Sequence, residues 1–296
     1  MPPAIPDQPG DLPDLNTALQ TGVTVVLWAL SIALLVQAVR IYRRDGSPLA
    51  VLLWFAIAVG SLIEPLYDIA YHLFWHVYDD GGGDAQWTLF TAFDLPQPVW
   101  VMPAYIVVFA GPVIFMYQGL AKAATMRQVF RFAGITAFTT WFFETLMINL
   151  HLYSYWGKQP TDLLDYPVYI SFMEAGQITG FAILVALLSR RATKRIHLAA
   201  VFVLFPANFA FTTLGAGFPA LIAINSSQDA SMPLLWLAAF ASVGLVTTGL
   251  WWTARLLIHD QEQEAARTAP AVAPAAAAPD PPPARAAEQP VGVPAD

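Results

Sequence analysis

Residues 49–76 read LAVLLWFAIAVGSLIEPLYDIAYHLFWH, an apolar stretch that two acidic residues interrupt. About 20 apolar residues are enough to cross the roughly 30 Å hydrocarbon core of a bilayer as a helix. An ionisable side chain inside such a helix is costly, so Glu64 and Asp68 predict a functional site. Glu144 and Glu174 interrupt two later apolar stretches, and no Lys or Arg stands near any of the four in the sequence.

The overall composition indicates a polytopic, all-α membrane protein. The chain has 296 residues, of which 57% are hydrophobic and 12% charged. A formal net charge of -7 argues against a nucleic-acid partner, since phosphate binding requires a basic surface. With no cysteine, the chain has no disulfide, thiolate metal ligand or thiol nucleophile.

Seven apolar stretches are long enough to span a bilayer, and together they predict a seven-helix bundle. They lie near Val23–Tyr42, Leu49–Trp75, Val99–Leu120, Val129–Leu150, Tyr166–Leu188, His197–Ile222 and Pro233–Ile258.

Basic residues cluster in every second connection between these stretches. The clusters are Arg40, Arg43 and Arg44, then Lys122, Arg127 and Arg131, then Arg190, Arg191, Lys194 and Arg195. Because positively charged connections stay on the cytoplasmic side, we expect the N-terminus outside, the C-terminus inside, and insertion into the cytoplasmic membrane.

The two ends of the chain differ from the central part. Residues 1–21 contain no basic segment followed by an apolar core, so we expect a flexible segment and no cleaved signal peptide. Residues 22–260 form the predicted transmembrane domain. Residues 261–296 are rich in Ala, Pro and Glu, which predicts a disordered cytoplasmic tail.

In the second apolar stretch, acidic and histidine residues recur at every fourth position. At about 100° per residue, Glu64, Asp68 and His72 share one face of a helix, and His76 lies at its edge. Pro65 cannot donate a backbone hydrogen bond, so a bend is expected there. A bend together with a polar face indicates the wall of a cavity.

The depths of the acidic residues indicate a shared chamber in the outer half of the membrane. At about 1.5 Å per residue, Glu64 and Glu144 lie roughly 24 Å from the cytoplasmic edge, and Glu174 roughly 12 Å below the outer edge. Further residues that we expect to contact a substrate there are Tyr67, Tyr71, Trp75, Asn149, Tyr153, Tyr155 and Gln177.

Several short motifs carry a resemblance to a known family. They are Glu64-Pro65-Leu66-x-Asp68-x-x-x-His72-x-Phe74, Pro96-x-Pro98, Pro103-x-Tyr105, Phe143-Glu144 and Tyr153-Ser154-Tyr155-x-Gly157. In this order they resemble the AveC-type spirocyclase family of actinobacterial membrane proteins, over roughly residues 20–190. The resemblance implies a role in secondary metabolism: closure of a polyketide dihydroxy ketone to a spiroketal, with or without dehydration. Glu64 stands where the family's motif has Asp.

Spiroketal closure requires one group that donates a proton and another that accepts one, and two carboxyls in unequal surroundings suit this chemistry. We expect Asp68 and Glu64 to be the acid–base pair, with His72 orienting them or relaying a proton. Glu144 is expected to stabilise positive charge, and aromatic residues to shelter it from water. We expect no cofactor; the partners are a lipophilic polyketide- or isoprenoid-like hydroxyketone and the lipid bilayer.

Two other functions fit the same residues. His72, His76 and Asp68 have a spacing that could hold a metal ion, as in a metal-dependent membrane oxidoreductase. Carboxyls within spans also suit a transporter or receptor that binds a lipophilic ligand without transforming it.

Overall fold

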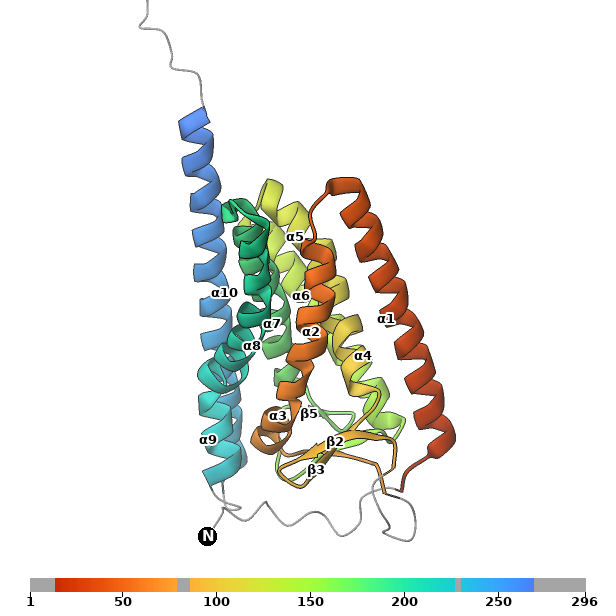
Figure 1. Cartoon of the computed structure of the whole chain (residues 1–296). Helices are drawn as coiled ribbons and strands as arrows, with labels where there is room; N and C mark the ends of the chain where they lie inside the picture. The colour runs from red at the N-terminus through yellow and green to blue at the C-terminus, as the bar shows by residue number, and fades with distance from the viewer. Residues whose placement is uncertain (1–13, 79–85, 227–229, 269–296) are drawn as a thin grey trace, which may run out of the picture.

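The computed structural model describes residues 14–78, 86–226 and 230–268 as a bundle of helices with short strands at one end (Figure 1). The helices are α1 (Thr17–Asp45), α2 (Leu49–Gly60), η1 (Ser61–Ile63), α3 (Glu64–Tyr71), α4 (Val101–Tyr105), η2 (Ile106–Ala110), α5 (Gly111–Lys122), α6 (Met126–Asn149), α7 (Tyr169–Arg191), η3 (Arg195–Ala200), α8 (Val201–Ala210), η4 (Phe211–Ala216), α9 (Phe218–Ser226) and α10 (Met232–Thr268).

Six helical stretches among the described residues are long and apolar enough to cross a membrane, which indicates a multi-pass membrane protein. They are Thr17–Asp45, Leu49–Tyr71, Val101–Lys122, Tyr169–Arg191, Arg195–Ala216 and Met232–Thr268. Large apolar side chains such as Phe115, Val203 and Leu237 are exposed on their outer surfaces, as lipid contact requires. The helical bundle is thus confirmed. The fourth predicted span, Val129–Leu150, corresponds to α6, which has 24 residues and is not among the six, so its membrane crossing remains a prediction.

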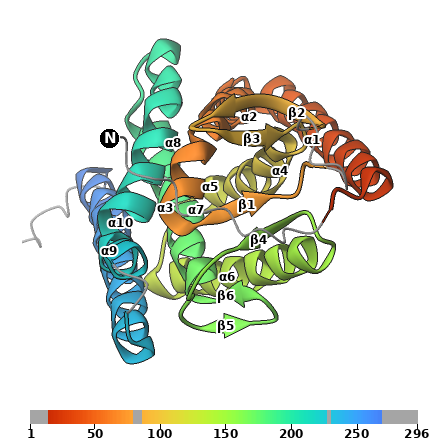
Figure 2. The ribbon, with the colours of Figure 1, turned by 90° about the horizontal axis from the view of Figure 1, so that it is seen from below.

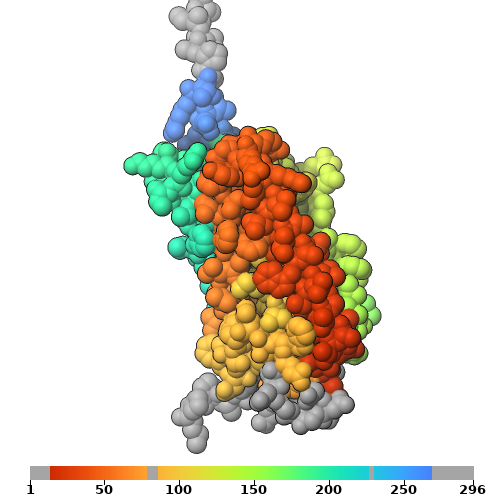
Figure 3. Space-filling model, turned by 45° about the vertical axis from the view of Figure 1, so that its right-hand side comes forward, coloured from red at the N-terminus to blue at the C-terminus, as the bar shows by residue number. Residues whose placement is uncertain are grey.

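Helix α7 lies at the centre of the bundle, where it packs against α5, α6, α8 and α10. Most of its residues are buried, in agreement with a sequence that is apolar on every face. By contrast, α1 lies at the edge of the bundle, as the space-filling view shows, and most of its side chains are exposed (Figure 3). The acidic residue of α7, Glu174, therefore belongs to the interior of the protein.

Several of the membrane-length helices are irregular rather than continuous. The 3₁₀ turn η1 separates α2 from α3 and ends two residues before Pro65, and the π-helical segment η2 precedes Pro112. A proline leaves a backbone carbonyl of the preceding turn unpaired, so such irregularity is expected beside it. At Gly60, a Cβ atom would collide with the ring of Phe205, so only glycine allows α2 to pack this closely against α8.

Three antiparallel strand pairs spread across one end of the bundle (Figure 2). They pair β1 (Leu73–Trp75) with β4 (Tyr153–Tyr155), β2 (Thr88–Ala92) with β3 (Leu95–Pro98), and β5 (Asp162–Leu163) with β6 (Tyr166–Pro167). In the first pair Phe74 lies opposite Ser154. The second predicted span is therefore too long by a few residues, because its last part forms β1.

Helix α10 is longer than the last predicted span. It continues to Thr268, whereas the sequence predicts a disordered tail from residue 261. Gln261 explains part of the difference, since its side chain donates to Leu120 O (2.7 Å) and accepts from Ala124 N (2.8 Å). The remainder of the predicted tail, residues 269–296, lies outside the described residues, as do residues 1–13 of the predicted N-terminal segment.

Candidate functional site

The start of α3 places the first acidic residue inside the bundle. Ser61 turns the chain within η1, where its hydroxyl donates to Ala58 O (2.8 Å). Glu64 and Pro65 then form the first turn of α3, a position that suits proline because the first backbone N–H groups of a helix have no partner inside it. The Glu64 carboxyl, 5% exposed, points toward α4 and accepts a hydrogen bond from the Tyr105 hydroxyl.

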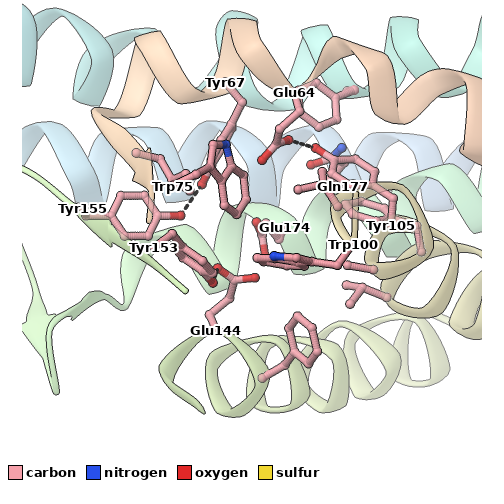
Figure 4. Close-up of a pocket in the computed structure, with 17 residues that line it drawn as sticks. Glu64, Tyr67, Trp75, Trp100, Tyr105, Glu144, Tyr153, Tyr155, Glu174 and Gln177 are labelled. Atoms are coloured by element: carbon pink, nitrogen blue, oxygen red, sulfur yellow. Dashed lines mark hydrogen bonds between the residues drawn. The ribbon is translucent and has the colours of Figure 1, made fainter. Parts of the chain in front are cut away.

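Three acidic side chains from different helices border one cavity: Glu64 from α3, Glu144 from α6 and Glu174 from α7 (Figure 4). The cavity with its mouth encloses about 570 Å³ of space free of atoms, of which about 50 Å³ can hold the centre of a water molecule. At ~10–15 Å³ for each water, this is room for a few waters or a small ring. The prediction that acids from separate helices face one chamber is confirmed for these three.

Tyrosine hydroxyls, rather than cations, contact the acids in this cavity. The Tyr153 hydroxyl donates to Glu144, as the Tyr105 hydroxyl does to Glu64. The hydroxyls of Tyr67 and Tyr155 bond to each other at 2.9 Å (Figure 4). Among the described residues that line the cavity there is no Lys, Arg or His. Its negative charge, when present, is therefore balanced only by neutral donors.

Aromatic rings form much of the cavity wall. The ring centroids of Trp75 lie 5.1 Å from those of both Trp100 and Tyr153, in edge-to-face arrangements. Trp100 and Tyr153 are nearly parallel, at 28° and 6.2 Å. Such contacts lock large side chains against one another. The wall therefore joins β1, the segment before α4, and β4.

Asp68 lies behind the wall of the cavity rather than on it. It is 1% exposed, and its Oδ2 accepts hydrogen bonds from Trp75 Nε1 (2.9 Å) and Gln97 Nε2 (2.6 Å). Its other oxygen, Oδ1, is buried without a partner among the described residues. Asp68 can thus act on a substrate only through side chains of the cavity wall, such as Trp75.

His72 does not share a face with the acids, contrary to the prediction. It ends α3 in the left-handed conformation (φ 58°), and its Nε2 bonds to Asn225 Oδ1 at 2.9 Å. The chain leaves the helix there because the next residues pair with β4, which the helical spacing of residues 64–76 does not reveal.

His76 is also directed elsewhere: its Nε2 bonds to Ser154 Oγ at 2.9 Å. The alternative metal set of His72, His76 and Asp68 therefore does not converge. Within the part of the chain that the structure describes, no three His, Asp or Glu side chains are placed to hold a metal ion.

Most of the predicted substrate-binding residues do line the cavity. These are Tyr67, Trp75, Tyr153, Tyr155, Glu174 and Gln177. Two do not: the Tyr71 hydroxyl donates to Thr213 O (2.7 Å), and Asn149, which is exposed, donates to Thr145 O (2.7 Å). Their sequence positions suggest the right depth, but the Tyr71 side chain reaches η4, and that of Asn149 bonds the backbone of its own helix.

Sequence reasoning assigned no role to three residues that build the site: Gln97, Trp100 and Tyr105. A signal existed for two of them, since Gln97 lies between Pro96 and Pro98 and Tyr105 ends another quoted motif. Trp100 carried no signal beyond its position near the end of a span, which is typical of an interfacial residue.

Three polar groups at the cavity have no hydrogen-bond partner among the described residues. They are Trp100 Nε1, Glu174 Oε2 and both atoms of the Gln177 amide, although Gln177 is only 1% exposed. Buried polar atoms are nearly always bonded to protein or to water. The cavity is therefore built for water or for a ligand with polar groups.

Comparisons with protein-family models, with curated proteins and with solved structures find no match to this chain.

Proposed function

We propose that this chain is an integral membrane enzyme that closes a lipophilic hydroxyketone by acid–base chemistry, forming a spiroketal or losing water, as its resemblance to AveC-type spirocyclases implies. The observation that carries the proposal is the placement of Glu64 and Glu144 on one cavity, each with a tyrosine hydroxyl as its donor. Two carboxyls that differ in their surroundings can serve as acid and base in one reaction.

In the proposed reaction, a dihydroxy ketone first forms a cyclic hemiketal. The Glu64 carboxylic acid gives its proton to the hemiketal hydroxyl, the C–O bond breaks, and water leaves. The second hydroxyl then attacks the resulting oxocarbenium carbon, and its proton passes to the Glu144 carboxylate. One spiroketal and one water are formed, and the proton returns to Glu64 through waters in the cavity. For dehydration, the base instead removes a proton from the neighbouring carbon.

The other polar residues take supporting roles in this proposal. Asp68 is a positioning residue, because from behind the cavity wall it accepts hydrogen bonds from Gln97 and from Trp75 of the wall. Trp100 and Gln177 offer unpaired groups that would bond the oxygens of the substrate. The aromatic wall supplies contact area for its hydrocarbon chains.

The proposed topology has seven spans, with α6 as the additional one, in the cytoplasmic membrane. The three basic connections support it: Arg190, near the end of α7, donates to Ala121 O near the end of α5 (2.9 Å), so two of these connections meet at one end of the bundle. By the positive-inside rule, this end is cytoplasmic and the cavity opens toward the other half of the membrane.

The test uses purified protein in lipid vesicles and a symmetrical ketone that carries a four-carbon hydroxyalkyl chain on each side. Its spiroketal is chiral, and closure without an enzyme yields both enantiomers equally. We expect an excess of one enantiomer with the wild-type protein and a racemate with Glu64→Gln. A racemate at the background rate with the wild-type protein would contradict the proposal. Uptake of the unchanged ketone, driven by a proton gradient, would instead identify a transporter.

A further inference from the structure

We propose that this cavity is a binding site for small organic cations, such as quaternary ammonium ions about the size of one six-membered ring. The inference rests on the proposed function in one respect, since an oxocarbenium ion formed there would use the same groups. It concerns equilibrium binding of a stable cation, however, and it can be tested without any turnover.

The lining of the cavity has the composition that favours cations. More than half of its lining residues are aromatic, and the only ionisable side chains with a usual charge at neutral pH are three carboxyls. Aromatic faces attract a cation through the negative potential of their π electrons, most strongly when water is excluded. A cation bound at the centre would face rings of α3, β1, α4 and β4 (Figure 4).

Glu174 is the carboxyl best placed to balance the ligand's charge. One oxygen each of Glu64 and Glu144 already accepts a hydrogen bond from a tyrosine, whereas Glu174 Oε2 is buried without a partner among the described residues. A carboxyl with only a structural role would be expected to bond a neighbouring helix. Its free oxygen therefore points to a ligand.

Gln177 provides an independent indication of a ligand. It lies one helical turn after Glu174 on α7, is 1% exposed, and leaves both atoms of its amide without a partner in the described structure. The unpartnered carbonyl oxygen of this amide is available as a second negative dipole for a cation. Within the described lining, an acidic ligand would instead meet three carboxyls and no basic side chain, so anions are disfavoured.

The enclosed part of the cavity limits the cation, whereas the larger spiroketal of the proposed reaction would extend into the mouth, within the total of about 570 Å³. The space that water centres can occupy, about 50 Å³, corresponds to a few waters and therefore to a compact ring rather than a long head group. N,N-dimethylpiperidinium meets this limit and carries a permanent charge. Its carbon counterpart, 1,1-dimethylcyclohexane, has the same shape without the charge. The anion of 1-methylcyclohexane-1-carboxylic acid supplies the opposite charge.

The test measures binding of these three compounds to the purified full-length protein by calorimetry, after subtraction of their partitioning into empty detergent micelles. We expect the cation to bind at least about 10-fold more tightly than its neutral counterpart, and the anion not to bind. Equal affinity for the cation and the neutral compound, or binding of the anion, would overturn the proposal. This comparison needs no variant.

Variants then locate the bound charge. We expect Glu174→Gln to weaken cation binding about 10-fold while the weak affinity for the neutral compound is unchanged. The control is Phe138→Leu, at a residue that is 63% exposed on α6, and it should bind like the wild type. An unchanged cation affinity in a folded Glu174→Gln protein would contradict the role of Glu174.

The two proposals fail in distinguishable ways. Cation binding without any enantiomeric excess in the ketone assay would overturn the proposed enzyme and leave the cation site in place. Turnover without a preference for the cation would overturn only the cation site. Inhibition of turnover by the piperidinium ion, lost in Glu174→Gln, would connect the two.

Discussion

Acidic side chains have different partners at the two ends of the bundle. Where α5, α7 and α10 meet, Asp260 is paired with both Arg190 and Arg191, at 2.9 Å for the former. Beneath the strand pairs, Glu64 and Glu144 accept hydrogen bonds from tyrosines instead, and no basic side chain among the described residues lines their cavity.

This difference in partners indicates that the carboxyl at one end stabilises the fold, whereas those at the other end can take part in a reaction. A carboxylate beside a fixed cation stays ionised and holds two helices together. A carboxyl that meets only neutral donors can take up or release a proton when a substrate requires it. We therefore expect substitutions beside Asp260 to change the stability of the protein, and substitutions at the cavity to change its turnover.

The largest effect is expected from Glu64→Gln. Gln has nearly the same shape and can still bond the Tyr105 hydroxyl, but it cannot donate a proton as an acid. Turnover should fall about 10²–10⁴-fold, while the protein remains folded. The control is Glu262→Gln, at an exposed side chain of α10, which should retain full turnover. Equal activity of the two variants would contradict the placement of the reaction at the cavity.

Arg190→Met tests the opposite end. It removes one of the two partners of Asp260 and the hydrogen bond to Ala121 O, and we expect the free energy of unfolding to fall by about 2 kcal/mol. Turnover per folded molecule should be unchanged. Unfolding in mixed micelles measures the first quantity, with Arg267→Met, at an exposed residue, as the control. A loss of turnover at full stability would mean that the ends are not separate.

Tyr153→Phe should have a smaller effect than either. It removes the donor to Glu144 but keeps the ring against Trp100, so turnover should fall about 10-fold. In a double-mutant cycle with Glu144→Gln the two losses should not add, since they remove one interaction. Tyr169→Phe is the control, because its buried hydroxyl has no partner among the described residues.

The smallest effect is expected on the pH dependence of stability, through His76, which bonds Ser154 in one of the strands that cover the cavity. Burial lowers the pKa of His76 below its usual value of 6.5. The folded protein then binds fewer protons than the unfolded chain between the two pKa values, so His76 contributes stability above pH 6.5 that is lost as the pH falls toward the folded-state value. We expect the melting temperature to drop between about pH 7.5 and about pH 5.5, and less so in His76→Gln. Identical pH profiles would contradict this role.

The sequence pattern predicted the structure correctly where the chain forms one continuous helix. It did not do so where segments far apart in the sequence pair as strands. The apolar stretches correctly indicated α1, α7 and α10, because burial and lipid contact follow composition. Acidic and histidine residues at every fourth position from Glu64 to His76 predicted one continuous helix. This prediction was wrong after Tyr71, because residues 73–75 bond to residues 153–155. No local pattern carries information about a partner strand so far along the chain.

The sequence alone determined that this is a helical membrane protein with acids at costly positions, because hydrocarbon tolerates few ionisable groups and their presence is visible in composition. Only the tertiary structure decided which of those acids share a cavity. Glu174 joins Glu64 and Glu144, whereas Asp68 lies behind Trp75 and His72 turns toward Asn225. The reason is geometric: a side chain's neighbours depend on how helices rotate, break and pack, and these are properties of the whole bundle.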